Sequence, residues 1–294
     1  MLDLAIAPKD VRLSTKAFDD IGLQRSQVAP GWDEVMMRCS AALLLALSLA
    51  TPTLAASHWQ PPAGTSFSII LSASPATVTT PAEVVDLDLF ETSKATVTTL
   101  KQQGKHVICY MSAGSWENWR KDAKDFPKSV IGKPLDGWPG ERYLDIRNLA
   151  VLGPIMKARL DLCKSKGFDA VDPDNVDSFE TKTGFPLTKA DAVTYLRFLA
   201  TAAHQRGIGI GLKNATEIAP SLLDTVDFAV TEDCFKQGWC KVSRNFVAKD
   251  KPVFAIEYTD NNIDFSAFCA QADKLGLSPI YKKRSLNVWE RRCP

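Results

Sequence analysis

The sequence predicts an α/β fold, a TIM-type (β/α)8 barrel with room for one additional strand. Short β-rich runs alternate with segments of helical spacing along most of the 294-residue chain. The runs are nearly continuously apolar, as in parallel strands that are covered on both faces. No G-x-G-x-x-G motif follows the first run, which argues against a dinucleotide-binding fold. Eight or nine such strands without a low-complexity linker between them favour a single barrel domain.

The predicted strands and helices follow one another in a regular order. The nine strand-like runs are residues 66–71, 84–90, 106–111, 142–146, 168–172, 208–212, 227–232, 252–258 and 278–283. Helical spacing is clearest over residues 152–167 and 188–207, and each of these segments ends on a glycine, where helices commonly stop. Thr188 and Asp191 stand at the spacing of a capping box, so we expect a helix to begin there.

The first part of the chain differs from the rest. Arg38 precedes the short apolar run 41–50 and a series of small residues, which is the pattern of a secretory signal peptide. The run is too short to span a bilayer. Because the pattern begins only after Met36 and Met37, we expect translation to start at one of them. The alternative is a genuine N-terminal tail ahead of a core or anchor helix. The expected parts are an upstream extension (1–35), the signal peptide (36–56) and the barrel domain (57–294).

Cysteine usage agrees with secretion. One of seven cysteines, Cys39, lies in the leader, and the other six are an even number, as an oxidising compartment allows. The pairs considered are Cys234 with Cys240, Cys269 with Cys293, and Cys109 with Cys163. The first pair is closest in sequence and is favoured, and the second could tie down the C-terminus. The third pair lies in apolar runs, where free buried thiols are equally compatible with the sequence.

Composition narrows the possible partners. An apolar content of 45% permits a sizeable core, and the net charge of +1 gives no basic excess. Nucleic acid is therefore not an expected partner. After signal cleavage we expect an extracellular monomer with no membrane attachment and no cofactor.

Polar residues gather where the predicted strands end. In DAVDPDNVDSF (169–179) four aspartates fall close together, although carboxylates repel one another. Such crowding calls for a metal, a cationic ligand or a reaction. Asp169 and Asp177 are interpreted as capping or solvated residues. The strand ends of a barrel meet at its active-site face, so we expect a mostly acidic pocket there. Its candidate residues are Asp88, Tyr110, Asp145, Asp172, Asp174, Asn175, Lys213, Asn214, Glu232, Glu257 and Tyr258.

Three kinds of site fit these residues. Glycoside hydrolysis needs two opposed carboxyl groups, which Asp174 and Glu232 could supply from different strands. A hard divalent cation could instead bind Asp88, Asp172 and Asp174. The third possibility is a sugar-binding barrel without turnover. Zinc is not expected, because no histidine stands at a strand end: His58 precedes the fold, His106 starts a strand and His204 lies on a helix.

Aromatic residues in loops favour a sugar ligand. The loop tryptophans are Trp116, Trp119, Trp138 and Trp239. Such rings offer a flat apolar face with a polar edge, which suits stacking against a sugar. Ordinary packing at the mouth of the barrel is the alternative for any single one of them.

Several blocks of the chain match a known family. CYMSAGSWENWR, GKPLDGWPGERYLDIR, DPDNVDSF, GLKN, TEDCF and AIEY occur in this order. From Trp59 onward the chain resembles glycoside hydrolase family 114, the endo-α-1,4-polygalactosaminidases. The resemblance implies a (β/α)8-type barrel that cuts α-1,4-linked galactosamine polymers, including galactosaminogalactan-type exopolysaccharide. It also implies that Asp174 and Glu232 are the catalytic pair. Trp116 stands where related sequences often have Tyr or Phe, and there it could alter a subsite.

A cationic polymer would suit the acidic residues. Galactosamine units carry an ammonium group below the pKa of the amine, so Asp88, Asp145, Asp172 and Glu257 would attract them. For Asp172, a structural role in pairing with another residue is as consistent with the sequence as substrate binding. We expect Lys213 to keep a neighbouring carboxylate ionised, and Asn175 or Asn214 to bond sugar hydroxyls. The hypothesis is a secreted endo-acting hydrolase with a retaining mechanism, with Asp174 as nucleophile and Glu232 as acid/base. The alternative is a secreted carbohydrate-binding barrel that has no turnover.

Overall fold

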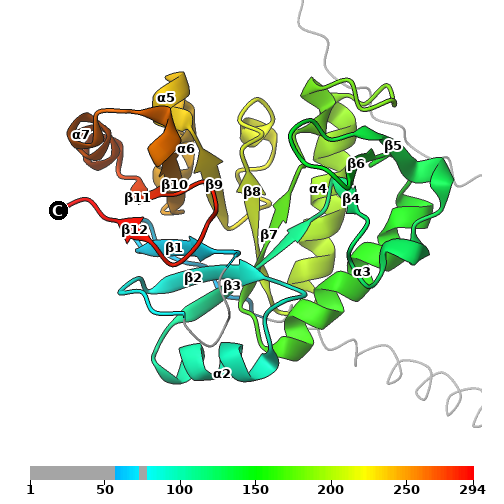
Figure 1. Ribbon diagram of the computed structural model, residues 1–294, viewed down its shortest axis with the longest axis horizontal. Coiled ribbons are helices and arrows are strands. Elements are labelled where there is room, and N and C mark those ends of the chain that lie inside the picture. The colour runs from blue at the N-terminus through cyan, green and yellow to red at the C-terminus, as the bar shows by residue number, and fades with distance from the viewer. Residues whose placement is uncertain (1–56, 73–77) are drawn as a thin grey trace, which may run out of the picture. The chain divides into compact units, whose positions relative to one another are not determined.

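The computed structural model describes residues 57–72 and 78–294 (Figure 1). The expected start site and signal peptide fall in residues 1–56 and lie outside the described residues. Within the described ranges, none of the helices combines the length and apolar character that a membrane crossing requires.

The described residues form a nearly closed barrel, which confirms the predicted fold. Nine strands are hydrogen-bonded in the order β1-β2-β3-β7-β8-β9-β10-β11-β12, and the first eight of these are parallel. The short last strand is antiparallel to β11. The strands are β1 (Phe67–Ile70), β2 (Val84–Asp88), β3 (His106–Ser112), β7 (Ala170–Asp174), β8 (Gly209–Lys213), β9 (Phe228–Glu232), β10 (Val253–Tyr258), β11 (Ser278–Lys282) and β12 (Glu290–Arg291).

Helices cover the outside of the barrel (Figure 1). They are α2 (Lys94–Gln102), α3 (Leu149–Lys166), α4 (Lys189–His204), α5 (Cys234–Gln237), α6 (Arg244–Val247) and α7 (Phe265–Leu275). The 3-10 turns are η2 (Ala123–Asp125), η3 (Lys128–Val130), η4 (Ser178–Glu180), η5 (Ala219–Ser221), η6 (Cys240–Ser243) and η7 (Thr259–Asn261). Thr188 and Asp191 form the predicted capping box at the start of α4, and Gly167 ends α3 in a left-handed conformation.

One predicted barrel strand belongs elsewhere. The run at 142–146 overlaps β6 (Glu141–Leu144), which pairs antiparallel with β4 (Ser115–Glu117) and β5 (Ile131–Pro134) in a separate three-stranded sheet. Glu141 and Leu144 of β6 are buried whereas Arg142 is exposed, as in a sheet that is not covered on both faces. The prediction of a barrel strand here was wrong, and β12 supplies the ninth strand of the main sheet.

The interior of the barrel changes from apolar to charged along its axis. Phe67 stacks on Phe254 with ring centroids 4.3 Å apart, and Phe228 packs beside them. Gly211 makes room for this packing, because a Cβ there would lie 2.4 Å from the ring of Phe228. These aromatic side chains fill the middle of the barrel. The polar strand ends above them are therefore left to form a site.

Three disulfides join the six cysteines of the described part. Cys234 and Cys240 have Cα atoms 4.7 Å apart, within the usual range, and Cys269 is bonded to Cys293. Both predicted pairs are confirmed. Cys109 on β3 is bonded to Cys163 on α3, so these two cysteines are not the free buried thiols that the sequence also allowed. This last bridge fixes a helix to the back of a central strand.

The C-terminal segment lies along the seam between β1 and β11. Leu286 O accepts a hydrogen bond from Leu71 N at 2.8 Å, and Glu290 accepts one from Ser68 Oγ at 2.5 Å. Arg292 Nη2 donates to a β1 carbonyl at 2.9 Å. Figure 1 shows β12 next to β1 and β11. The residues after β11 thus complete the wall that the eight parallel strands leave open.

Candidate active site

Three neighbouring strands each end on a charged residue. Asp174 ends β7, Lys213 ends β8 and Glu232 ends β9. The next residue in each case, Asn175, Asn214 or Asp233, has a positive φ of 61°, 52° or 58°. Asn and Asp tolerate this left-handed conformation better than most other residues, and it turns the chain away sharply after the strand. The three charged side chains are thereby held together at the C-terminal mouth of the barrel.

Lys213 is the centre of this group. Its Nζ lies 3.5 Å from Asp174 Oδ1, 3.4 Å from Glu232 Oε2 and 3.7 Å from Asp172 Oδ2. The side chain is buried, and burial alone would lower the pKa of Lys213. The three carboxylates outweigh burial and raise its pKa well above the ordinary value. The site therefore contains a permanent ammonium group that offsets the repulsion among the crowded carboxylates.

Two tyrosines and an asparagine orient the carboxylates of Asp174 and Glu232. Tyr110 Oη donates to Asp174 Oδ2 at 2.8 Å. Tyr258 Oη donates to Glu232 Oε1, while Asn214 Nδ2 donates to Glu232 Oε2 at 3.3 Å. Because Asp174 Oδ1 and Glu232 Oε2 each lie within 3.5 Å of the same nitrogen, they are at most two such distances apart. The two carboxyl groups thus both contact Lys213 and lie close enough to each other to act on one glycosidic bond.

These side chains line a cleft of about 460 Å³. Six carboxyl residues and three basic residues contribute to its wall, so the cleft is acidic on balance. Trp119 and Trp138 stand at its edge with 52% and 56% of their surface exposed. The lining residues are Leu71, Ser72, Asp88, Tyr110, Glu117, Trp119, Arg120, Leu135, Trp138, Glu141, Asp174, Asn175, Asp177, Lys213, Asn214, Glu232, Tyr258, Arg284, Ser285 and Leu286.

Most of the residues expected at the site do line this cleft. They are Asp88, Tyr110, Asp174, Asn175, Lys213, Asn214, Glu232 and Tyr258. Four others are not part of its wall: Trp116, Asp145, Asp172 and Glu257. The Nε1 of Trp116 donates to Ala123 O at 2.9 Å, and its ring packs on the core, so the exposed tryptophans nearby take the place expected for it.

Strand geometry and strand identity explain two of the exceptions. Successive residues of a strand face opposite sides, so Tyr258 and Glu257 cannot both point into the barrel. Glu257 points outward, where its Oε1 accepts from Phe235 N at 2.7 Å. Asp145 follows β6 of the side sheet, and its carboxylate is held by Arg147 at 2.7 and 2.8 Å. Arg147 lowers the pKa of Asp145 and leaves this carboxylate already paired.

Asp172 lies below the cleft beside Asp86, a residue that the sequence did not single out. Both are fully buried, and none of their carboxyl oxygens has a hydrogen-bond partner in the described part of the chain. Burial and then the nearby Asp172 raise the pKa of Asp86 well above its usual value. Burial likewise raises the pKa of Asp172 to about 6, although Lys213 opposes this. Burial and the closeness of the two carboxyl groups therefore favour the protonated form of this pair.

The site is completed by residues that the sequence analysis did not place there. Arg120 donates to Asp88 Oδ1 and Oδ2 at 3.0 and 2.6 Å and to Glu117 at 2.9 Å, so Asp88 is already neutralised. Among the described residues, Glu141 and Asp177 have no basic partner of this kind, and burial raises their pKa values to about 7 and about 6. Asp177 is therefore part of the cleft wall and not a solvated residue. The only signal for Arg120 and Glu141 was their place in the blocks SWENWR and PGER.

Glu257→Gln is expected to stabilise the protein above neutral pH. Burial raises the pKa of Glu257 from 4.5 to about 7, and Oε2 has no hydrogen-bond partner among residues 57–72 and 78–294. The folded protein thus holds a proton that the unfolded chain loses, and the stability from this proton disappears as the pH rises from about 4.5 to 7. Urea unfolding should show the variant more stable at pH 8 by on the order of 1–3 kcal/mol, and nearly unchanged at pH 5. An equal difference at both pH values would show that Glu257 is not the group that titrates.

A larger hollow of about 570 Å³ lies beside the C-terminal disulfide. Its wall includes Cys269, Cys293 and Arg292, and Asp273 is the one acidic side chain among its described lining residues. Glycoside hydrolysis requires two opposed carboxyl groups, which this hollow does not offer. The candidate active site is therefore the smaller cleft at the mouth of the barrel.

The comparisons with known proteins agree with this geometry. The model of glycoside-hydrolase family GH114 matches residues 48–294. A crystal structure of Aspergillus fumigatus Ega3 in complex with galactosamine is 40% identical, with a TM-score of 0.76, and the match covers 81% of this chain and 98% of that one. An uncharacterised protein of Deinococcus radiodurans is 27% identical over an alignment of 237 residues, and the match covers 71% of this chain and 75% of the relative.

A more distant structure shares the fold. The glycoside hydrolase domain of PelA from Pseudomonas aeruginosa is 16% identical with a TM-score of 0.60, and the match covers 78% of this chain and 98% of that domain. At this identity the likeness concerns the architecture alone. The family model spans most of the chain, including every strand of the barrel. The chain therefore belongs to glycoside-hydrolase family GH114.

Proposed function

We propose that this protein is a secreted, endo-acting hydrolase of α-1,4-linked galactosamine polymers, such as galactosaminogalactan-type exopolysaccharide. The observation that carries the proposal is the pair of carboxylates, Asp174 and Glu232, which both contact Lys213 in an acidic cleft. The structure solved with galactosamine, at 40% identity, supports the choice of sugar. Three disulfides support an oxidising compartment.

The proposed reaction retains the anomeric configuration. Asp174 attacks the anomeric carbon while Glu232 donates its proton to the leaving glycosidic oxygen. Glu232 then removes a proton from water, and this water releases the sugar from Asp174. Retaining enzymes place the two carboxyl groups about 5–5.5 Å apart, whereas inverting enzymes place them about 6.5–9.5 Å apart. The shared contact with one lysine nitrogen limits the separation of the two carboxyl groups and is compatible with the shorter class.

The cleft offers a specific partner for an amino sugar. Glu141 and Asp177 line it without a basic residue of their own, so an ammonium group of the polymer can take that place. Their pKa values of about 7 and about 6 mean that both carboxyl groups ionise as the pH rises through this range. Attraction for the polymer therefore increases over this window, until the amine itself loses its proton. Trp119 and Trp138 add exposed aromatic faces for stacking.

Release of reducing ends from partly deacetylated α-1,4-galactosamine polymer tests the proposed function directly. The expected products are oligosaccharides of mixed length, because an endo-acting enzyme cuts within the chain. The anomeric configuration of the first product, followed by NMR, distinguishes retention from inversion. Binding of the polymer without release of reducing ends would instead support a non-catalytic carbohydrate-binding barrel.

Full N-acetylation of the polymer is expected to reduce kcat/KM by about tenfold or more, equivalent to about 1.4 kcal/mol. The acetyl group removes the positive charge that Glu141 and Asp177 are proposed to bind. Polymers of equal length with graded acetylation provide the comparison, and Glu141→Gln should reduce the difference between them. Equal turnover of neutral and cationic polymer would remove the electrostatic part of the proposal and leave the hydrolase assignment in place.

A further inference from the structure

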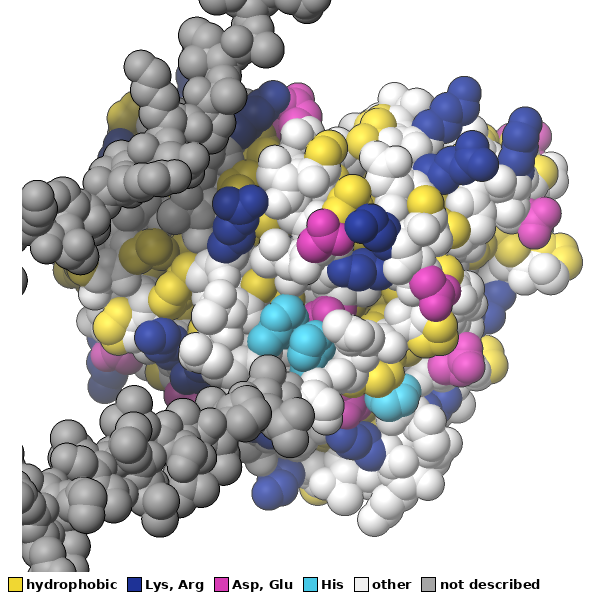
Figure 2. All heavy atoms as spheres, turned by 180° about the vertical axis from the view of Figure 1, so that it is seen from behind, with side chains coloured by type: hydrophobic (Ala, Val, Ile, Leu, Met, Phe, Trp, Pro, Cys, Tyr) yellow, Lys and Arg dark blue, Asp and Glu magenta, His cyan; other side chains and the backbone are white. Residues whose placement is uncertain are grey.

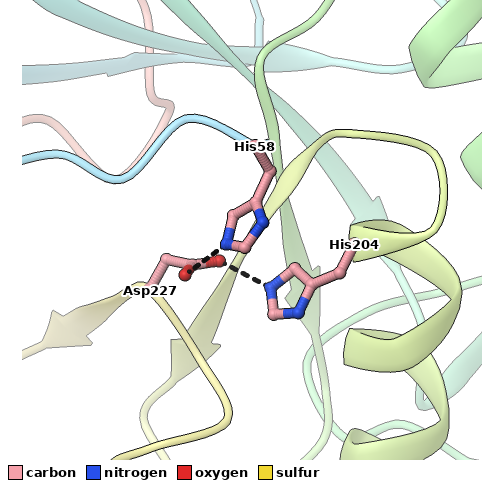
Figure 3. Close-up of side chains that lie close together, drawn as sticks. All are labelled: His58, His204 and Asp227. Carbon is pink, nitrogen blue, oxygen red and sulfur yellow. Dashed lines mark hydrogen bonds and ion pairs between the residues drawn. The ribbon is translucent and has the colours of Figure 1, made fainter. Parts of the chain in front are cut away.

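A second cluster of ionisable side chains lies at the other end of the barrel. His58 precedes β1, His204 ends α4 and Asp227 immediately precedes β9, so all three stand on the side where strands begin (Figure 3). The Nε2 atoms of His58 and His204 lie 2.9 Å from Asp227 Oδ1 and Oδ2, respectively. The proposed reaction at the mouth of the barrel uses none of these groups.

Their donor atoms form a compact set. One atom from each of the three side chains can be chosen so that all lie within 4.8 Å of one another. Zinc binds imidazole nitrogen at about 2.0–2.1 Å and carboxylate oxygen at about 2.0–2.2 Å, so donors around one ion lie a few ångströms apart. Two imidazoles and a carboxylate suit zinc and related divalent transition metals better than they suit calcium or magnesium.

The carboxylate is well positioned, and the imidazoles are accessible. Asp227 is only 3% exposed and its Oδ2 also accepts from Ile210 N at 2.9 Å, which fixes its orientation. The histidines are 16% and 29% exposed. Figure 2 shows a pair of adjoining histidine side chains at the surface of the molecule. An ion can therefore reach the cluster from solvent.

The surroundings supply further polar groups. Gln60 Nε2 lies 3.1 Å from His58 Nε2 and 3.2 Å from Asp227 Oδ1, so a turn of this amide would offer its oxygen as a fourth donor. The nearby ammonium of Lys251 is engaged by the carbonyl oxygens of Leu223 and Val226 at 2.6 and 2.5 Å. Its charge is thus held by backbone oxygens and not by the cluster.

The two rings must move slightly to share one ion. They are stacked with centroids 3.9 Å apart and planes inclined by 12°, so each Nε2 faces its own carboxylate oxygen. A metal ion lies in the plane of each imidazole ring that binds it. Two stacked, nearly parallel rings cannot both have the same ion in their planes. Tilting of one partly exposed ring removes this obstacle without disturbing Asp227.

We propose that His58, His204 and Asp227 form a binding site for a zinc-class divalent ion. The ion would join a segment that precedes the first strand to two elements far along the chain, since His58 and Asp227 are 169 positions apart in the sequence. Such a link restricts the unfolded chain and stabilises the fold by mass action. The sequence predicted no zinc site at the strand ends where the active site lies, and this site is at the opposite end of the barrel. Zinc binds the neutral form of imidazole, so binding should weaken in acid.

Titration of the untagged secreted protein with Zn²⁺, by calorimetry and equilibrium dialysis, tests the site. We expect one ion per chain and a higher Tm in the presence of Zn²⁺ than of Ca²⁺ or Mg²⁺. His58→Gln and His204→Gln should each weaken Zn²⁺ binding at least about tenfold, equivalent to about 1.4 kcal/mol. Substitution by Co²⁺ should give the visible absorption of a four-coordinate site, which both variants lose.

His106→Gln is the matched control. This third histidine also stands where a strand begins, stacked on Trp59, and its Nδ1 lies 3.4 Å from Asp169. It should leave Zn²⁺ affinity unchanged although it too removes one imidazole. Absence of stoichiometric Zn²⁺ binding, or equal loss of affinity in all three variants, would overturn the proposal.

Discussion

Asp174→Asn and Glu232→Gln are each expected to reduce turnover by several orders of magnitude while the protein remains folded. A covalent nucleophile or a general acid contributes at least about 10²–10⁴-fold, and removal of one member of a cooperating pair costs nearly as much as removal of both. Both substitutions keep the size of the side chain and most of its hydrogen bonds with Tyr110, Tyr258 and Asn214. Initial rates of reducing-end release, with Tm as the measure of folding, check this expectation.

Azide distinguishes the two roles. It should rescue a Glu232→Ala variant with retained anomeric configuration, because the covalent intermediate on Asp174 still forms. It should rescue Asp174→Ala with the opposite configuration, because azide then takes the place of the nucleophile. Asp161→Asn on the outer helix α3 is the control and should keep full activity, since its exposed carboxylate only pairs with Arg206. Near-normal activity of either site variant would mean that the residue is misassigned.

Lys213→Met is expected to destabilise the protein by about 3–5 kcal/mol at neutral pH, because removal of one partner leaves buried charges uncompensated. The change leaves the carboxyl groups of Asp172, Asp174 and Glu232 without the ammonium that now lies within 3.7 Å of each. Burial already raises the pKa of Asp172 to about 6, and the variant lacks the ammonium that opposes this, so it should lose stability as the pH rises and recover part of it in acid. Urea unfolding at pH 5 and pH 8 measures both effects.

The same variant should be almost inactive. A carboxyl group that holds a proton cannot act as a nucleophile, and loss of the common ammonium also removes the contact that sets the positions of Asp174 and Glu232. Lys101→Met removes a different lysine that pairs with Asp169 at 2.5 Å on a partly exposed surface, where such pairs contribute little. An equal loss of stability in both variants would show that the three buried partners of Lys213 do not account for the effect.

The sequence located site residues correctly where a charged residue directly follows an apolar run that forms a barrel strand. Asp174, Lys213 and Glu232 each follow an apolar run directly, so the common direction of parallel strands was enough to place them at one mouth. The same reasoning was wrong for Asp145, because β6 is apolar enough to resemble a barrel strand and yet runs in a side sheet. Direction of pairing depends on contacts with β4 and β5, which spacing along the chain does not reveal.

Two further features could not be read from local patterns. Glu257 and Tyr258 were both expected in the pocket, but the register that decides which of them faces inward is set by β9 and β11 on either side. Arg120 reaches the cleft from the segment after β4 and Glu141 from the start of β6, and the placement of both depends on tertiary packing. The buried Asp86 was missed because a single acidic residue inside an apolar run carries no sign of its partner, Asp172.

The seam between β1 and β11 affects how the chain can fold while it is being synthesised. Leu286, Glu290 and Arg292 hold the first strand in place, yet they follow every other barrel strand in the chain. During synthesis, β1 therefore leaves the ribosome long before the residues that cover its free edge exist. An exposed strand edge invites pairing with other chains, so this interval is the period of greatest risk of aggregation. Formation of the Cys269–Cys293 bond can come only after Cys293 has emerged, and it marks the end of that interval.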